Sequence, residues 1–263
     1  HYYYHEESNK TVIYDDWEDN GGNSQSVATY GGFYIARYEA GIPTSADFCP
    51  TNNDMQYDDA TKKNTTSVIP VSKKGVSWSC ISQKNAEIVS ENMYKDSESV
   101  TSSLVDSYAW DTVCNYISEG KSNKSEYLRD SSLYGNYYNG TKTIKNTRYA
   151  IHTYNNGWTK ASTYGKGDIA QPNRTGRNKI EVETGASTDY STKNIYDLAG
   201  NMWEWTTEKG KHKSTSDTAT IYAVRRGGSF NDSGNVSGVY RNGSIGTETT
   251  DISTGFRVVL YIK

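Results

Sequence analysis

The residue types that carry out covalent and redox chemistry are few in this chain and widely spaced. Its three cysteines, Cys49, Cys80 and Cys114, are odd in number and far apart, which predicts no disulfide framework and at most one bridge. The sequence contains no C-x-x-C pair, no G-x-S-x-G nucleophile turn, no phosphate-binding G-x-x-x-x-G-K loop and no H-E-x-x-H zinc motif. Carboxylates are plentiful, but no spacing pairs two of them for acid–base work. The common catalytic arrangements are therefore not found.

Histidine is equally sparse. His1 and His5 lie at the very start of the chain, and His152 and His212 are isolated from each other. We interpret His152 and His212 as ordinary surface or loop residues. Cys114 lies on the apolar face of a predicted helix, so we interpret it as a small buried hydrophobe and not as a reactive thiol.

Two helices are predicted in the first half of the chain, where apolar residues recur at three- and four-residue spacing. In residues 82–94 this face consists of Ala86, Val89 and Met93. In residues 106–118 the pattern is stronger and consists of Trp110, Val113, Cys114 and Ile117. Asp106 or Ser107 can cap the second helix by accepting from unpaired backbone N–H groups, and Gly120 follows its end.

Strands are predicted on both sides of these helices. Residues 31–39 form a candidate strand entered through a glycine turn, and residues 202–206, 222–226 and 255–262 alternate or are apolar enough for strands. Short strands are also expected near 147–153 and 180–183, within a long segment (121–193) that lacks periodicity. Residues 1–30 read as an irregular N-terminal arm and residues 31–263 as one domain. Helices followed by antiparallel strands predict an α+β fold.

Charge and hydropathy exclude two classes of partner. The net charge is −3 and no basic stripe is present, so a nucleic-acid partner is not expected. No apolar stretch approaches the ~18–20 residues that a membrane span requires. The first residues show no apolar signal-peptide segment and no cleavage site.

Three motifs resemble the formylglycine-generating enzyme (sulfatase-modifying factor) family. Residues 194–205, N-I-Y-D-L-A-G-N-M-W-E-W, are similar to its G-L-Y-D-M-x-G-N-V-W-E-W signature. Residues 226–230, R-G-G-S-F, and 254–257, T-G-F-R, are similar to its R-G-G-S and G-F-R elements, in the family's order. Residues 32–39 and 76–78 resemble its opening strand and its V-S-W step. The resemblance implies a C-type-lectin-like fold in which two helices are surrounded by small antiparallel sheets and long loops.

The resemblance also implies which residues to test for oxidase chemistry. In the family's oxidases, two cysteines after the R-G-G-S element bind copper, because Cu(I) selects soft thiolates. Counted from Ser229, these positions hold Asp232 and Ser237, and no cysteine follows Cys114. Copper is therefore not expected, nor is the three-histidine site of the related iron enzymes. We predict that the chain is not an enzyme.

The family's calcium ligands have counterparts in the turn between Asp197 and Glu204. The resemblance implies ligation by the carboxylates of Asp197 and Glu204 and by the backbone oxygens of Gly200 and Met202. Oxygen ligands on a glycine-containing turn suit Ca²⁺. The alternative is that Asp197 and Glu204 accept backbone N–H bonds and hold the turn without a metal ion. Trp203 and Trp205 are expected in the core, and Arg226 and Arg257 are expected to pair with buried carboxylates.

A variable binding segment is the hypothesis for residues 230–254. One branch of this fold serves diversity-generating retroelements, whose adenine-directed mutagenesis of Asn codons does not yield Lys, Glu, Gln, Met or Trp. Between Phe230 and Thr254 only Glu248 belongs to these types. Apolar residues alternate there with small polar ones, as in a paratope. The candidate ligand-binding residues are Phe230, Asn231, Asp232, Asn235, Val236, Ser237, Val239, Tyr240, Asn242 and Ile245. The alternative is that the apolar members belong to the local core.

The function favoured by the sequence is non-catalytic recognition through a diversified C-terminal face. The expected ligand is a protein or a surface glycan, and the expected location is a cell surface, the secreted fraction or a virion. One alternative is an oxidoreductase of the same family with an unrecognised site. Another is a structural phage-tail or surface module whose 230–252 segment is packed.

Overall fold

The structure, a computed structural model, describes residues 6–7, 10–15, 22–43, 67–119, 124–140, 147, 149–152, 158–160, 179–212 and 220–263. Cys49, His1 and His5 lie outside these residues. The side chains of His152 and His212 are not described, so the interpretation of all four histidines stays a prediction.

The α+β prediction is confirmed. The largest sheet has the order β1 (Glu6–Glu7), β2 (Lys10–Asp15), β10 (Trp203–His212), β11 (Thr220–Arg226) and β12 (Arg241–Ile245). β13 (Thr254–Phe256) joins it by pairing in parallel with β10. A second sheet has the order β3 (Tyr34–Ile35), β14 (Val258–Ile262) and β4 (Val100–Leu104). Smaller sheets are formed by β6 (Trp158–Lys160), β5 (Tyr149–His152) and β7 (Ile180–Val182), and by β8 (Ser191–Thr192) and β9 (Ile195–Tyr196).

Both predicted helices are present, with ends within two residues of those expected. α3 (Gln83–Asn92) is capped by Ser82, whose side chain accepts from the Asn85 N–H. α4 (Ser107–Glu119) is capped by Asp106, whose Oδ1 accepts from the Ala109 N–H at 2.7 Å. These caps satisfy donors that have no partner in the first turn of a helix. Among the described residues, no helix has the length and apolar character needed to cross a bilayer.

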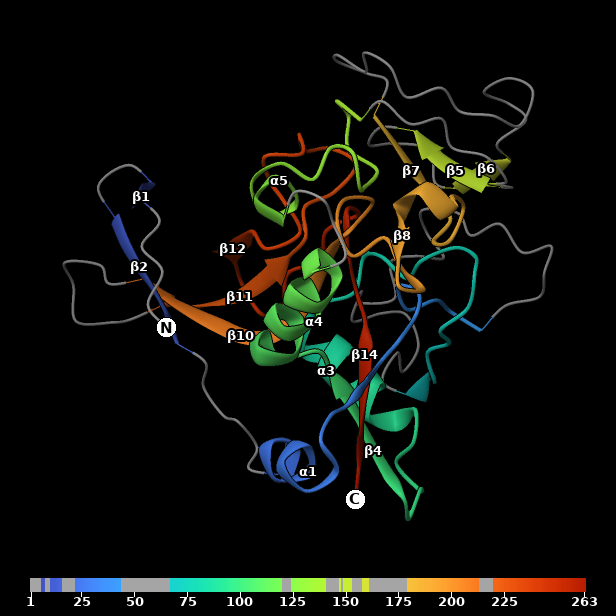
Figure 1. Cartoon of the computed structure of the whole chain (residues 1–263), viewed down its shortest axis with the longest axis vertical. Coiled ribbons are helices and arrows are strands. Elements are labelled where there is room, and N and C mark those ends of the chain that lie inside the picture. Colours follow the sequence, from blue (N-terminus) through green and yellow to red (C-terminus); the bar gives the residue numbers. More distant parts are fainter. Residues whose placement is uncertain are drawn as a thin grey trace.

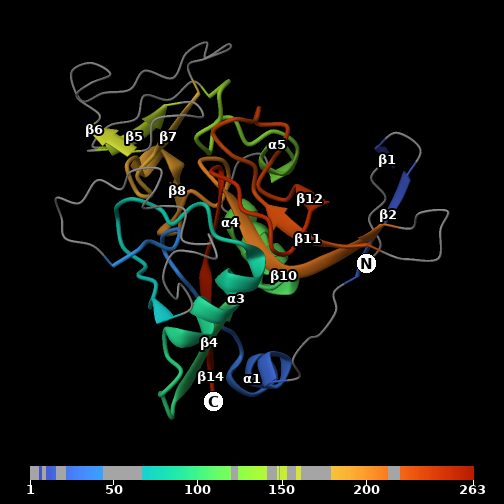
Figure 2. The same ribbon diagram turned by 180° about the vertical axis from the view of Figure 1, so that it is seen from behind.

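The two helices bury the faces that their periodicity predicts. α4 contributes Trp110, Val113, Cys114 and Ile117 to one core cluster. α3 contributes Ala86 and Val89 to a second cluster, together with Trp205 and Phe256. α4 lies in front of β10 in Figure 1, and α3 lies in front when the molecule is seen from behind in Figure 2. The central strands are thus packed between the two helices.

Two expectations about the N-terminal part are wrong. Residues 10–15 and 22–30 are not irregular: β2 pairs with β10, and residues 22–30 form α1 (Gly22–Tyr30), which packs near β14. The Ser26 hydroxyl on α1 donates to the Ile262 carbonyl at 2.7 Å, which ties the helix to the second sheet. The strand expected over 31–39 is reduced to Tyr34–Ile35, which lie opposite Leu260 and Val259 of β14. The described residues also form α5 (Lys124–Arg129) and the 3-10 turn η3 (Thr188–Tyr190).

Candidate functional site

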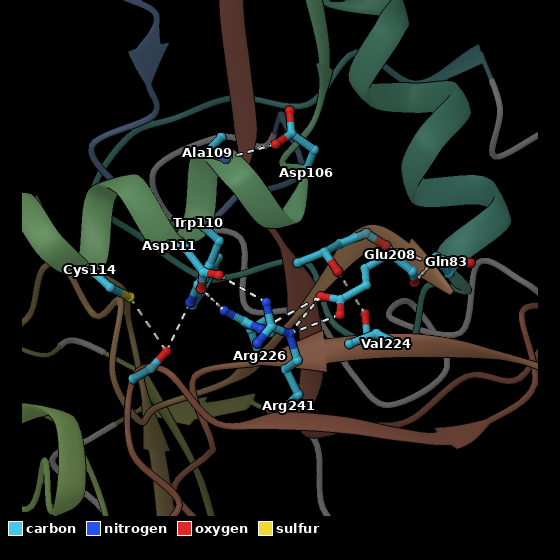
Figure 3. Close-up of polar contacts among 12 residues, drawn as sticks. Gln83, Asp106, Ala109, Trp110, Asp111, Cys114, Glu208, Val224, Arg226 and Arg241 are labelled. Atoms are coloured by element: carbon cyan, nitrogen blue, oxygen red, sulfur yellow. Dashed lines mark hydrogen bonds and ion pairs between the residues drawn. The ribbon is translucent and has the colours of Figure 1, made fainter. Parts of the chain in front are cut away.

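A network of four charged side chains fixes both ends of the loop between β11 and β12 (Figure 3). Arg226, the last residue of β11, is fully buried and binds Asp111 on α4. Arg241, the first residue of β12, donates to Asp111 at 2.9 Å and to Glu208 on β10 at 2.8 Å. A fourth contact of 3.6 Å joins Arg226 to Glu208. The two cations and two carboxylates balance in charge. Their contacts attach α4 to the strands β10, β11 and β12.

Further contacts hold the interior of this loop, residues 227–240. The Trp110 indole N–H donates to the Gly238 carbonyl at 2.8 Å, and the Cys114 thiol lies 3.7 Å from the same oxygen. The Ser237 hydroxyl donates to the Leu128 carbonyl at 2.8 Å. The Gly234 N–H donates to Asn139 at 2.9 Å. The loop is therefore held along its length by α4 and by residues 128–139.

Asp232 and Ser237, at the positions of the oxidases' copper cysteines, take part in this framework. Asp232 Oδ2 accepts from the Ser229 backbone N–H at 2.9 Å and from its hydroxyl at 2.7 Å. Ser237 is buried, with 3% of its surface exposed. Both side chains thus hold the loop through hydrogen bonds, and both offer hard oxygen atoms in place of soft thiolates.

The two cysteines that the structure describes are both buried. Cys114 is buried in the α4 core, as predicted, and burial raises the pKa of its thiol to about 12. Cys80 is also buried, is not in a disulfide, and packs against Phe230. Thiolates are the nucleophilic and metal-binding form of cysteine, so Cys114 stays protonated at neutral pH.

The ten candidate ligand-binding residues differ widely in exposure. Asn235 is exposed, Phe230 and Ser237 are buried, and the other seven are half-buried. The expectation that Phe230 is an exposed anchor is wrong, because it packs with Cys80 and Ile252 and retains only 1% of its surface. Val239 and Ile245 likewise pack against the two core clusters. The apolar residues of the segment support the loop, whereas its most exposed described side chains, Asn235, Glu248, Thr249 and Thr250, are polar.

An aromatic and cationic stack borders this segment and was not anticipated from the sequence. The Arg225 guanidinium lies 4.7 Å from the Trp203 ring centroid, and the Tyr240 ring packs edge-on against Trp203 with the ring centroids 6.0 Å apart. Arg225 also donates to the Thr254 hydroxyl at 2.7 Å. Trp203 and Trp205 are both buried, as predicted. The only sequence signal for the stack is the alternation of β10 and β11, which does not reveal their pairing.

The predicted calcium residues lie in a buried acidic group. Arg257 donates to Glu204 through two hydrogen bonds of 2.6 and 3.0 Å, as expected for a buried pair. Asp197 Oδ2 accepts from the Gly185 N–H at 2.8 Å and from the Thr184 hydroxyl at 3.0 Å. The Gly200 carbonyl accepts from the Met202 N–H at 2.8 Å. The Gly185 N–H bond to Asp197 is of the kind expected if the turn is held without a metal ion, whereas Glu204 accepts its printed hydrogen bonds from the Arg257 side chain and not from a backbone N–H.

Burial raises the pKa values of the carboxylates in this group. Glu39 adds a third carboxylate, and its Oε2 accepts from Ser77 and Asn201 at 2.6 and 2.9 Å. Burial raises the pKa of Glu39, and the neighbouring Asp197 and Glu204 raise it further. Burial also raises the pKa of Asp197 to about 6, although hydrogen bonds from Gly185 and Thr184 and the charge of Arg257 oppose the shift. Within the described residues, no three His, Cys, Asp or Glu side chains are arranged to hold a metal ion. Calcium binding therefore stays a prediction.

Comparison with known proteins gives one family. The sequence model of the sulfatase-modifying factor enzyme 1-like domain matches residues 15–262. Among solved structures, CarF is similar at 13% identity, over 97% of this chain and 87% of that chain, with a TM-score of 0.38. No curated protein matches the chain.

Proposed function

Because the chain belongs to the sulfatase-modifying factor enzyme 1-like family, we propose that it is a non-catalytic, ligand-binding member of that family. The proposal places the binding face on the 230–252 segment. The partner is a protein or a surface glycan.

The observation that carries the proposal is the chemistry at Asp232 and Ser237. A copper oxidase of the kind that the motifs resemble needs two thiolates there, and Cu(I) binds carboxylate and hydroxyl oxygens poorly. Asp232 accepts two hydrogen bonds from Ser229, and the Ser237 hydroxyl donates to the Leu128 carbonyl. These residues contribute to loop structure, which is the role expected when a fold is retained without its reaction.

The rigidity of the loop supports a recognition role. Binding residues are usually presented on loops by a rigid scaffold, and pre-organisation lowers the entropy lost on binding. Here Arg226 and Arg241 hold the two ends through Asp111 and Glu208. Substitutions at the exposed Asn235 leave these supports untouched. A scaffold of this kind tolerates sequence change at its surface without unfolding.

We propose further that the segment is diversified by a retroelement. The scarcity of Lys, Glu, Gln, Met and Trp between Phe230 and Thr254 supports this reading. The burial of Phe230 and the packing of Val239 and Ile245 favour a packed structural module as the alternative. The DNA around the gene distinguishes the two. A near-repeat of the 3′ coding end that differs only at adenines, beside a reverse transcriptase, is the expected finding, and an unrepeated 3′ end contradicts diversification.

Copper binding tests the non-catalytic assignment. The matched variant restores both thiols, Asp232→Cys with Ser237→Cys, and Cu(I) is titrated against a chromophoric chelator. We expect the double variant to withdraw one more Cu(I) from the chelator than the wild type, because paired thiolates form a soft site. Equal withdrawal by the two proteins contradicts the assignment.

A further inference from the structure

A second segment, residues 131–140, packs beside the proposed binding segment. The Ser131 N–H donates to the Gly234 carbonyl at 2.7 Å, and the Gly234 N–H donates to the Asn139 side chain at 2.9 Å. The lack of a side chain at Gly234 permits this approach, because a Cβ there would lie 2.3 Å from the Ser132 backbone nitrogen. The two segments therefore lie side by side.

The composition of residues 131–140 is that of a recognition loop. The segment reads S-S-L-Y-G-N-Y-Y-N-G, so every residue except Leu133 is Ser, Tyr, Gly or Asn. These four types predominate in the antigen-binding loops of antibodies, because Tyr supplies rigid contact area while Ser, Gly and Asn provide adaptable hydrogen bonds. None of the residues in the segment is charged. This composition favours contact with an uncharged patch of a partner over binding of an ionic group.

Two fully buried side chains fix the backbone of the segment. The Asn136 amide nitrogen donates to the Ile180 carbonyl and to Asn201 Oδ1, both at 2.9 Å. The Tyr137 hydroxyl donates to the Gly227 carbonyl at 2.7 Å. The segment is thus pre-organised by the core, which lowers the entropy lost when a partner binds.

The remaining side chains supply the apolar contact that residues 230–252 lack at their surface. The most exposed described side chains of residues 230–252 are polar, whereas Leu133 keeps 38% of its surface exposed. Tyr138 is half-buried, and Lys179 Nζ lies 4.8 Å from its ring centroid. The Tyr138 N–H donates to the Asp232 carbonyl at 3.1 Å, which places this tyrosine against the binding segment. An apolar and an aromatic side chain therefore stand beside the polar surface of residues 230–252.

We propose that residues 131–140 form the second half of the recognition face, and that Leu133 and Tyr138 bind an apolar side chain of a protein partner. Protein interfaces place aromatic and apolar anchors among polar residues that exclude water. The Leu133 side chain has no hydrogen-bonding group to match the hydroxyls of a sugar, which favours a protein over a glycan. This inference rests on the proposed function, since it names the class of partner at the 230–252 face.

The probe is N-acetyl-L-phenylalaninamide, which carries an aromatic protein side chain and no net charge, with methyl β-D-glucopyranoside as the sugar counterpart. Binding to the purified chain is followed by the NMR shifts of its backbone amides. We expect saturable binding of the phenylalanine probe with shifts in both segments, including Tyr138 and Gly234. We expect no saturable binding of the sugar.

Matched variants test the two anchors. Leu133→Ala and Tyr138→Ala should each weaken binding of the phenylalanine probe about fivefold or more, because each removes contact area and keeps the backbone hydrogen bonds. Leu133→Asn, which keeps the branched shape and removes the apolar character, should weaken binding in the same way. The controls Ile69→Ala and Tyr108→Ala alter side chains that are 50% and 64% exposed outside both segments, and they should leave binding unchanged.

The proposal is overturned by saturable binding of the sugar at this face, by the absence of saturable binding of the phenylalanine probe, or by undiminished binding to the Leu133 and Tyr138 variants. Melting temperature separates loss of contact from loss of fold, since variants at these positions should melt close to the wild type. Shifts confined to residues 230–252 also overturn the role of residues 131–140, but they leave the proposed binding face standing. Cu(I) binding at Asp232 and Ser237 is measured separately and decides the non-catalytic assignment.

Discussion

Replacing Arg257 by methionine removes the cation that pairs with Glu204 in the buried acidic group. Its guanidinium makes two hydrogen bonds to Glu204 and two to the carbonyls of Ala36 and Tyr196, at 3.0 and 2.8 Å. Neither member of the ion pair exposes more than 1% of its side chain. Methionine keeps most of the volume, so the effect of the substitution is mainly electrostatic.

The expected loss follows from what the substitution leaves behind. Removing one partner of a buried ion pair costs about 3–5 kcal/mol, because the other charge remains buried. Glu204 would then lie near Glu39 and Asp197 without a counter-charge. We expect the free energy of unfolding to fall by about 4 kcal/mol, a large part of the roughly 5–15 kcal/mol typical of a domain. A second substitution, Glu204→Gln, should recover part of this loss by removing the unpaired charge.

Urea denaturation followed by circular dichroism measures these differences at neutral pH. The control is Arg37→Met, which alters an exposed arginine and should change the free energy by less than about 0.5 kcal/mol. The reasoning fails if Arg257→Met lies within about 1 kcal/mol of the wild type. It also fails if adding Glu204→Gln to Arg257→Met brings no recovery.

Three further predictions concern the same turn. Burial raises the pKa of Asp197 to about 6, so its contribution to stability is full below its unfolded pKa near 4 and is lost as pH rises through 6. Between pH 4.5 and 7, the free energy of unfolding of Asp197→Asn, measured by denaturation, should therefore fall less than that of the wild type. An equal fall in the two proteins contradicts the raised pKa. Gly200→Ala should lower the free energy of unfolding by about 2 kcal/mol or more, because φ is +72° and a Cβ would lie 2.8 Å from the Asn136 backbone. The control Gly32→Ala, which has open space around it, should change the free energy of unfolding little. If calcium binds at Asp197 and Glu204, a chelator should lower the melting temperature, and an unchanged temperature counts against the site.

The sequence predicted the elements whose signals are local. The spacing of Trp110, Val113, Cys114 and Ile117 identified α4, because an amphipathic helix repeats its buried face every 3.6 residues. Asp106 identified its start, since the cap is made within one turn. The pairing of Arg257 with a buried carboxylate was also predicted.

Features that depend on residues far apart in the chain could not be predicted. The pairing of Arg226 with a carboxylate was expected, but its partners and Arg241 were not. The network joins side chains from α4, β10, β11 and β12, and Arg241 and Asp111 are separated by 130 positions. Phe230 appeared exposed because its neighbours in sequence are polar, while its packing partners Cys80 and Ile252 are brought to it by the fold.

We propose that this family member recognises a ligand and does not oxidise a cysteine. The most direct test incubates the purified chain with a cysteine-containing sulfatase peptide, Cu(I), oxygen and a thiol reductant, and detects the aldehyde of formylglycine by mass spectrometry. The account predicts no aldehyde above a control without protein, because Asp232 and Ser237 cannot supply the paired thiolates. Multiple-turnover formation of formylglycine by the wild-type chain would contradict it.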